Sequence, residues 1–216
     1  MFRLDEEVSG SVSLRPIVSV IEDAPSGALL FSLEDIKIHL RLEIDEDAED
    51  TFLKRITGAA TEWVEEICGM SILPRTIQAS LSQWATDQYP LVDVGIKPIR
   101  EIVEVKYADV YGGGQKALDP AAYTVFRMGH RSLLKPVNGG WPTVRFDHDS
   151  VLITAKVGYE PVDDDYAANV PKRLQQAILL AVGDLYENRE AQATSTRLDA
   201  SMYVNRSFRN LIRGFR

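Results

Sequence analysis

Apolar side chains recur at two different periods along the chain, and the change of period divides it into helical and β-rich parts. Between residues 50 and 68 they recur every three or four positions, which is the spacing of one helical face. Gly69 follows this stretch and suits the left-handed residue that often ends a helix. The positions that define the predicted face are Phe52, Ile56, Ala59, Ala60, Trp63 and Ile67.

A shorter helix is predicted to begin just after Ser32. The Ser32 side chain can cap the helix, and Asp35 completes a pattern similar to a capping box. The acidic stretch EIDEDAED, residues 43–50, then separates the two helices. Because Asp accepts hydrogen bonds from the first N–H groups of a helix, Asp45 or Asp47 is the expected cap of the second helix.

From Pro74 to Glu160 the apolar period changes to about two, which is typical of strands. Three consecutive glycines at 112–114 accept the positive φ that a chain reversal needs. A short strand is also predicted within Ser13–Ile21, in an N-terminal arm. The strands predicted in the β-rich part cover residues 76–84, 99–111, 122–127 and 150–159.

A third long helix is predicted after the β-rich part. Asn169 is the expected cap, and Pro171 falls in the first turn, where its missing N–H is tolerated. Leu179 and Leu180 lie off the main apolar stripe, so this helix is either central in a bundle or packed against another subunit. A last short helix is predicted over Ser207–Ile212. The main stripe consists of Leu174, Ile178, Ala181, Val182 and Leu185.

These elements predict an α+β fold in which a helical bundle carries a β-rich insertion between its second and third helices. The short C-terminal helix completes the bundle. Four parts are expected: an N-terminal extended arm at 1–31, a bundle at 32–73 and 161–190, an insertion at 74–160, and a basic tail at 191–216.

The net charge of −8 argues against general affinity for free nucleic acid, because such proteins need a basic surplus. The charge is also unevenly distributed, with acids concentrated at 43–66 and arginines in the tail. The two regions either attract each other between subunits or form two solvated faces. The N-terminus MFRLDEEVSG lacks the apolar core of a signal peptide, and no run of 18 apolar residues predicts a membrane span.

Residues with catalytic or metal-binding chemistry lack the partners that such sites require. His148 stands between two aspartates but has no second His or Cys at ligand spacing. The single cysteine, Cys68, follows two glutamates and is expected to pack at a helix end. Glu187 and Glu190 form a possible carboxylate pair, but an ion-pairing contact fits a helix end better. No enzyme activity, cofactor or metal is therefore expected.

Several motifs, taken in order, resemble one protein family over about residues 31–190. Each is weak alone, but their succession along one chain is specific. Together they resemble the head–tail connector, or adaptor, proteins of tailed phages and gene transfer agents. The motifs are SLEDIKIHLR at 32–41, WVEEICG at 63–69, PIREI at 98–102, VKYAD at 105–109, LDPAAY at 118–123, Trp141-Pro142, VPKRLQQAILL at 170–180 and LYENRE at 185–190.

The resemblance implies a structural virion protein without catalytic activity. Members of this family form a ring, usually of twelve copies, beneath the portal protein of the head. The ring offers its far side to the next head-completion or tail protein, and DNA passes through its centre without sequence-specific binding. The implied location is the head–tail junction of a virion that is assembled in the cytoplasm of a bacterial host.

Within this resemblance, three sets of residues are candidate interaction sites. The portal-interface candidates are Arg206, Phe208, Arg209, Leu211, Ile212, Arg213 and Phe215 in the tail. The inter-subunit candidates are Tyr186, Glu187, Arg189 and Glu190. The candidates for acidic residues that face the lumen are Glu43, Asp45, Glu46, Asp47, Glu49 and Asp50.

Two alternatives remain open from the sequence. The tail either orders on the portal or packs on its own bundle. The whole chain is either a connector or a stand-alone α+β module that oligomerises and serves binding or regulation. Measuring the mass of the protein mixed with portal separates the last two, since only a connector assembles on the portal ring.

Overall fold

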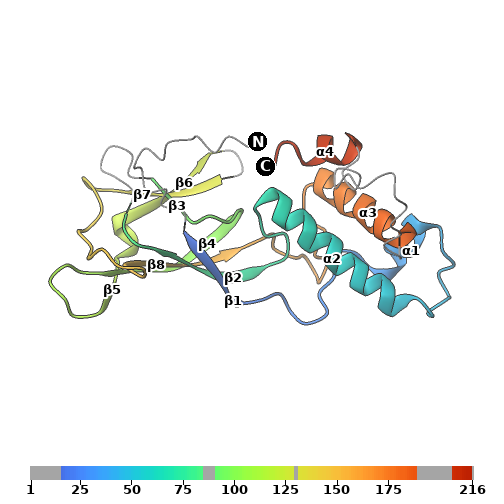
Figure 1. The fold of residues 1–216 in the computed structure, drawn as a ribbon, viewed down its shortest axis with the longest axis horizontal. Helices are drawn as coiled ribbons and strands as arrows, with labels where there is room; N and C mark the ends of the chain where they lie inside the picture. Colours follow the sequence, from blue (N-terminus) through green and yellow to red (C-terminus); the bar gives the residue numbers. More distant parts are fainter. Residues whose placement is uncertain (1–15, 85–90, 129–130, 189–205, 216) are drawn as a thin grey trace, which may run out of the picture.

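The computed structural model describes residues 16–84, 91–128, 131–188 and 206–215. It has a β-rich half and a helical half, which lie end to end along the long axis of the molecule (Figure 1). Each half has its own hydrophobic core. The α+β class predicted from the sequence is confirmed. The division into arm, bundle, insertion and tail as separate parts stays a prediction.

The β-rich half consists of two antiparallel sheets that pack on each other. The larger sheet has the order β1-β2-β8-β4-β5, and the smaller one has the order β3-β7-β6. A 3-10 turn, η1 (Pro120–Ala122), leads into β6. The strands are β1 (Ile17–Glu22), β2 (Arg75–Leu81), β3 (Val92–Asp93), β4 (Ile99–Ala108), β5 (Gln115–Ala117), β6 (Tyr123–Met128), β7 (Arg131–Pro136) and β8 (Val151–Val157).

The register of the larger sheet follows from which side chains must be buried. β2 and β8 alternate buried and half-buried residues, so one face of each strand lies on the core. The pairs Ile77↔Ala155 and Ala79↔Ile153 keep these faces together. β1 comes from the N-terminal arm and pairs with β2, which the sequence pattern did not reveal.

The helical half packs α1 (Leu33–Leu40), α2 (Asp50–Cys68), α3 (Lys172–Glu187) and α4 (Arg206–Ile212) around one core. Ser32 caps α1 as predicted, since its side chain accepts a hydrogen bond from Asp35 N at 3.1 Å. Gly69 ends α2 in the left-handed conformation, with φ 57° and ψ 48°. No helix within the described ranges is both long and apolar enough to cross a bilayer.

Three details of the predicted helices are wrong. The residue before α2 is Glu49, not Asp45 or Asp47, and it makes no side-chain cap, while Asp47 accepts from Asp50 N through its backbone carbonyl. Ala59 is exposed, because the buried face of α2 is rotated toward Leu53, Ile56, Ala60 and Val64. Pro171, not Asn169, immediately precedes α3, while the Asn169 side chain donates to Glu160 O at 2.9 Å.

In the part of the chain that the structure describes, three stretches of backbone cross from one half to the other. They are residues 23–32 between β1 and α1, residues 69–74 between α2 and β2, and residues 158–171 between β8 and α3. The larger sheet and the helical bundle are therefore joined by these connections, which lie between the two halves in Figure 1.

Candidate functional site: the junction and the surfaces it positions

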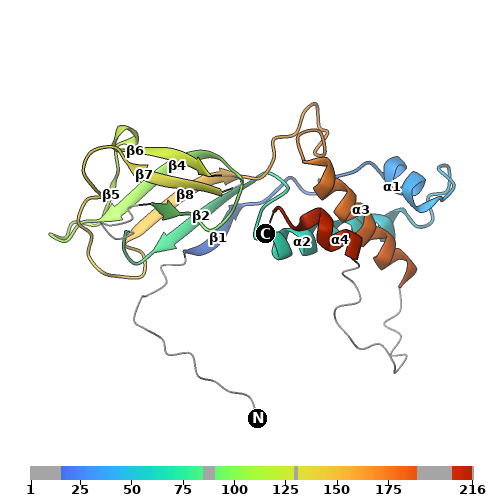
Figure 2. The same ribbon diagram turned by 90° about the horizontal axis from the view of Figure 1, so that it is seen from above.

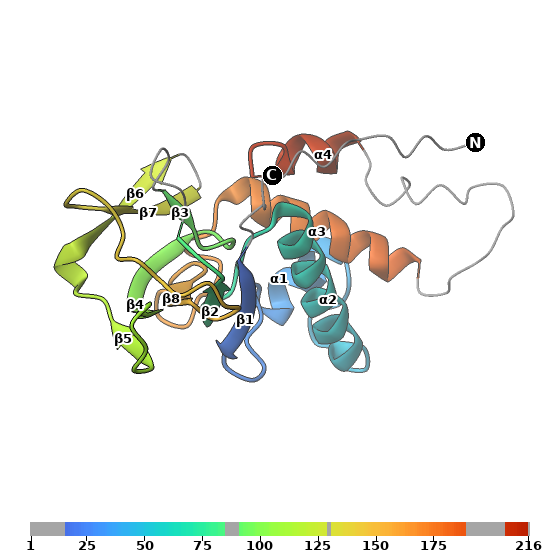
Figure 3. The same cartoon turned by 60° about the vertical axis from the view of Figure 1, so that its left-hand side comes forward.

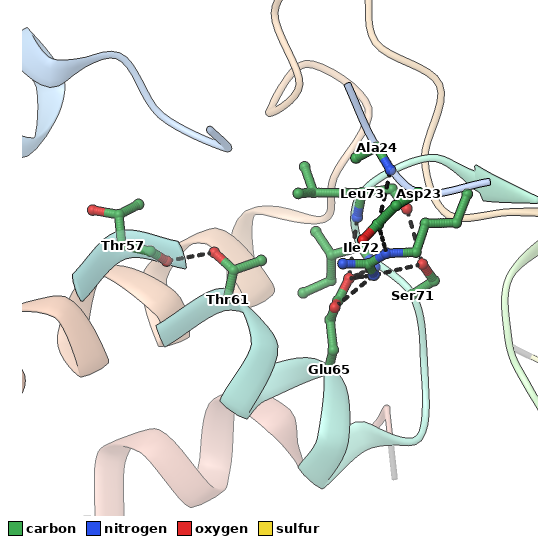
Figure 4. Close-up of polar contacts among 9 residues, drawn as sticks. Asp23, Ala24, Thr57, Thr61, Glu65, Ser71, Ile72 and Leu73 are labelled. Atoms are coloured by element: carbon green, nitrogen blue, oxygen red, sulfur yellow. Dashed lines mark hydrogen bonds and ion pairs between the residues drawn. The ribbon is translucent and has the colours of Figure 1, made fainter. Parts of the chain in front are cut away.

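A buried carboxylate at the end of α2 organises the junction between the two halves (Figure 4). Glu65 is only 8% exposed, and its Oε1 accepts from Ile72 N at 2.5 Å and from Leu73 N at 3.2 Å. Arg75, at the start of β2, donates from Nη1 to both carboxylate oxygens of Glu65, at 2.8 and 2.7 Å. A buried charge is costly unless it is paired and hydrogen-bonded. This geometry therefore holds together α2, residues 69–74 after it, and β2.

The same arginine reaches the segment that follows β1. Arg75 Nε donates to Asp23 Oδ1 at 2.6 Å, and Ala24 N donates to the same oxygen at 2.8 Å. The hydrogen bond from Arg75, with that from Ala24, lowers the pKa of Asp23. Burial alone would lower the pKa of Arg75, but its bonds to Glu65 and Asp23 outweigh burial and raise it. The Asp23 carboxylate and the Arg75 guanidinium are therefore both charged at neutral pH.

The segment after β8 (residues 158–171) packs against the segment after α2 (residues 69–74) so closely that there is no room for a side chain at Gly158. Gly158 has φ 85°, and a Cβ at this position would lie 2.1 Å from Leu73 O. Tyr159 N donates to Ile72 O at 3.0 Å. Only glycine combines this backbone conformation with so close an approach. The junction thus fixes how the two halves, and the surfaces on them, are oriented.

The acidic loop folds around a buried lysine from α1. Lys37 is 5% exposed, and its Nζ donates to Ile44 O at 3.1 Å and to Glu46 O at 2.6 Å. Its Nζ also lies 2.7 Å from Asp50 Oδ1. One ammonium therefore donates hydrogen bonds to two loop carbonyls and forms an ion pair with a carboxylate. Lys37 was not among the residues predicted to matter, although its spacing from Leu33 and Leu40 places it on the apolar face of α1.

The lumen-facing candidates divide into two groups in the structure. Glu49 accepts a hydrogen bond from the Tyr186 hydroxyl at 2.7 Å, and Asp50 is paired with Lys37, so these two stabilise their own subunit. The other four, Glu43, Asp45, Glu46 and Asp47, are exposed at the end of the helical half.

The end of α3 is partly used within the subunit. The Tyr186 ring lies half-buried, 6.2 Å from the ring of Phe52. Asn188 closes the helix, since both its backbone N and its Nδ2 donate to Asp184 O. Burial, followed by the nearby charge of Glu187, raises the pKa of Asp184. Of the inter-subunit candidates, Glu187 is exposed, and Arg189 and Glu190 lie outside the described residues.

The C-terminal helix α4 packs on its own bundle. Phe208, Ile212 and Phe215 are buried in the helical core, and the Phe208 ring stacks on Trp63 at 4.9 Å. Arg173 donates from Nη2 to Asn210 O at 2.5 Å, and its guanidinium lies 5.8 Å from the ring centre of Phe215. These three apolar candidates therefore point inward, because burying them contributes more than leaving them exposed to water.

The outward side of α4 carries the remaining portal candidates. Arg209 and Arg213 are exposed, and Leu211 is half-buried. The backbone of Arg206 begins the helix, but its side chain is outside the described part.

Comparisons with known proteins match one part of the sequence to a protein family and most of the fold to solved structures. Residues 31–90 match the model of a family described as Phage gp6-like head-tail connector protein. The chain carries a head–tail connector domain. This domain begins at Phe31, before α1, and includes α2 and β2, so the junction residues Glu65 and Arg75 both belong to it. The family resemblance inferred from the sequence motifs is confirmed.

The fold of the entire chain, beyond the connector domain, resembles chains from solved particles. One belongs to the virion of a native gene transfer agent particle, with TM-score 0.72 and 20% identity over 93% of this chain and 95% of that one. Another is from the neck of an empty gene transfer agent particle computed with C6 symmetry, with TM-score 0.71, 19% identity and coverage of 93% and 95%. A third is from the neck of a native particle computed with C12 symmetry, with TM-score 0.65, 18% identity and coverage of 93% and 94%. No protein in the curated set matches the sequence.

The cysteine and the Asp-flanked histidine considered from the sequence lie in different places. Within the described ranges, no group of three or more His, Cys, Asp or Glu residues is arranged to hold a metal ion. Cys68 is buried at the end of α2, where it packs in the helical core as expected. His148 lies exposed in the loop before β8, and its backbone N donates to Asp147 Oδ1.

Proposed function

We propose that this chain is a structural subunit of a ring at the head–tail junction of a phage-like or gene transfer agent particle. The ring joins the portal protein to the next head-completion or tail protein, and DNA passes through its centre without sequence-specific binding. Assembly takes place in the cytoplasm of the bacterial host. No catalytic step or cofactor is part of this function.

One observation carries the proposal: a connector domain at residues 31–90 lies in a chain whose fold matches neck subunits of gene transfer agent particles over 93% of its length. The family match at residues 31–90 includes little of the β-rich half, so the fold match is what extends the proposal to that half. Because the related neck was computed with C12 symmetry, we propose a twelve-membered ring. Closed rings of identical subunits need two different complementary surfaces on each copy.

The proposed inner surface of the ring is the exposed part of the acidic loop. Glu43, Asp45, Glu46 and Asp47 project from the end of the helical half, held in place by the Lys37 contacts at the base of the loop. A wall of negative charge repels phosphate, so DNA moves past it without being held.

The proposed portal-facing surface is the outward side of α4. Arg209, Leu211 and Arg213 lie there, and arginine is enriched among residues that anchor protein interfaces. The proposed contact between subunits involves Glu187 at the end of α3, with Arg189 and Glu190 beyond it and Tyr186 supporting the helix end from inside.

Imaging the purified protein after mixing with portal rings of the same particle tests this function. We expect a ring of copies on one face of the portal, with residues 43–47 toward the channel and α4 toward the portal. A monomer or dimer that leaves the portal unoccupied would instead support the stand-alone binding module. A ring with the acidic loop on its outer wall would disprove the lumen assignment alone.

A further inference from the structure

Two strand edges in the β-rich half differ from the other two. Among the described residues, the outermost strands are β1 and β5 in the larger sheet and β3 and β6 in the smaller one. β5 has three residues and β3 has two, whereas β1 and β6 have six each. A long outermost strand presents a row of backbone N–H and C=O groups that can pair with another strand.

The side chains of β1 and β6 are unusually apolar for edges that face water. Six large apolar side chains on these strands are exposed, by fractions from 37% for Val125 to 68% for Ile17. Soluble proteins commonly protect such edges with lysine or with proline inside the strand. β1 reads IVSVIE and β6 reads YTVFRM, so neither strand contains lysine or proline. The apolar side chains concerned are Ile17, Val20 and Ile21 in β1, and Val125, Phe126 and Met128 in β6.

These two edges lie on opposite sides of the β-rich half. Figure 2 shows β6 along one margin and β1 along the other, with the remaining strands between them, and Figure 3 agrees. Two different surfaces on opposite sides of one subunit are the arrangement from which head-to-tail rings are built. In a ring of identical copies, a contact between the β1 edge of one copy and the β6 edge of the next would therefore cover both edges of every copy.

The two edges also match in the faces of their side chains and in charge. Val20 pairs with the buried Ile77, and Val125 pairs with the buried Leu134, so both valines lie on the core face of their sheet. Joining the strands through these valines keeps core faces on one side, as strand pairing requires. Each strand has a single charged residue, Glu22 in β1 and Arg127 in β6, and the two charges are opposite.

We propose that β1 of one subunit pairs edge to edge with β6 of the next subunit, so that neighbouring β-rich halves form a continuous belt of strands. This inference rests on the proposed ring and specifies one of its contacts. Main-chain hydrogen bonds provide the affinity in such strand addition, and the side chains on both faces select the partner.

The test is disulfide cross-linking of the full chain assembled on portal rings, with Val20→Cys and Val125→Cys in the same molecule. Side chains directly opposite each other on paired strands have Cβ atoms close enough for a disulfide. Oxidation is expected to give a ladder of covalent oligomers that extends to the full ring. Cys68 is present in every variant and buried, so it serves as a common background.

Two matched controls identify the contact. Each single variant, Val20→Cys or Val125→Cys alone, is expected to give no ladder. A variant that combines Val20→Cys with Lys116→Cys, on the opposite edge strand β5, is also expected to give none. A ladder from this control as strong as from the test variant would overturn the proposal, because it would reflect random collisions.

A second variant tests the same edge without cross-linking. Met128→Lys is expected to weaken self-association at least about tenfold, while the melting temperature of the subunit stays unchanged, because this side chain is 54% exposed and lies on the face of β6 away from Val125. Rings that assemble normally with Met128→Lys, or assembled rings of the double-cysteine variant in which oxidation forms no disulfide between positions 20 and 125, would overturn the strand pairing and leave the proposed function standing. If the unmodified chain formed no ring on the portal, the proposed function itself would fail.

Discussion

At the scale of single residues, the charged pair of Glu65 and Arg75 determines how the two halves meet. The carboxylate accepts hydrogen bonds from two backbone N–H groups and from the guanidinium, so each donor in this buried place has a partner. Removing one member of a buried ion pair is costly because the other charge is left uncompensated. Loss of either member of the pair is therefore expected to destabilise the junction between the two halves.

Glu65→Gln is expected to lower the free energy of unfolding by about 3 kcal/mol, since Arg75 loses its charged partner and one oxygen becomes a donor. Urea titration of the full chain measures this change. Glu62→Gln is the matched control, because Glu62 is exposed one turn earlier on the same helix and should unfold like the unmodified chain. An equally stable Glu65→Gln variant would show that the junction does not depend on this charge.

Asp23→Asn is expected to destabilise the protein by about 0.5 kcal/mol near neutral pH, the usual contribution of an exposed ion pair. The pKa of Asp23 is lowered in the folded state, so its contribution is present above the ordinary carboxyl pKa of about 3.9 and is lost as the pH falls through the folded value. The difference between the two proteins should therefore disappear in acid, as followed by thermal unfolding at several pH values. A difference that grows below pH ~4 would contradict this assignment; Ser26→Ala in the same segment is the control.

At the scale of elements, local patterns predicted what lies close in sequence and missed what pairs over distance. The 3.6-residue period located α1, α2 and α3, and the left-handed end at Gly69 followed from residue type alone. The pairing of β1 with β2 joins residues nearly sixty positions apart, and nothing in either stretch identifies its partner. Lys37 was missed for a different reason: it lies close in sequence to the loop carbonyls that it binds, but the residue pattern predicts an acidic loop without predicting which cation the loop folds around.

The short helix α4 shows why the tail could not be assigned from its composition. Helices of this length are unstable alone, so α4 depends on tertiary packing. Its alternation of arginine with apolar residues fits a partner surface and the chain's own bundle equally well. The structure buries Phe208, Ile212 and Phe215 in that bundle and leaves the arginines outside.

Phe208→Ala is expected to lower the free energy of unfolding by about 3–5 kcal/mol, because it removes a fully buried ring stacked on Trp63. Limited proteolysis should also cleave the variant faster near α4. Chemical denaturation measures the first effect, and Ser207→Ala, exposed on the same helix, is the control. Unchanged stability and unchanged cleavage would mean that α4 is not held by this contact.

At the scale of the whole molecule, the two halves carry separate sets of proposed contacts to neighbours. Those proposed for the helical half are the end of α3 and the outward side of α4, and those proposed for the β-rich half are the edges of β1 and β6. A ring held at two levels resists tilting of its subunits better than one held at a single level. The junction is what keeps the two levels in a fixed relation.

Replacing Glu187 and Arg189 together by Ala is expected to weaken ring assembly and to leave the melting temperature of the subunit unchanged. Each exposed ion pair contributes only about 0.5 kcal/mol, but the contact repeats at every subunit boundary of the ring, so the effect accumulates. Native mass measurement of assemblies on portal rings is the readout. Gln176→Ala, exposed on the same helix, is the control, and normal assembly of the double variant would refute this contact.

The three crossings between the halves also have a mechanical consequence. In the proposed ring, a single linker between the halves would extend under load. A pull on the β-rich half is instead divided among three backbone segments, residues 23–32, 69–74 and 158–171. Twisting is opposed as well, because three attachment points define a plane. We therefore expect the subunit to behave as one stiff unit, in which a force applied to one half is transmitted to the other.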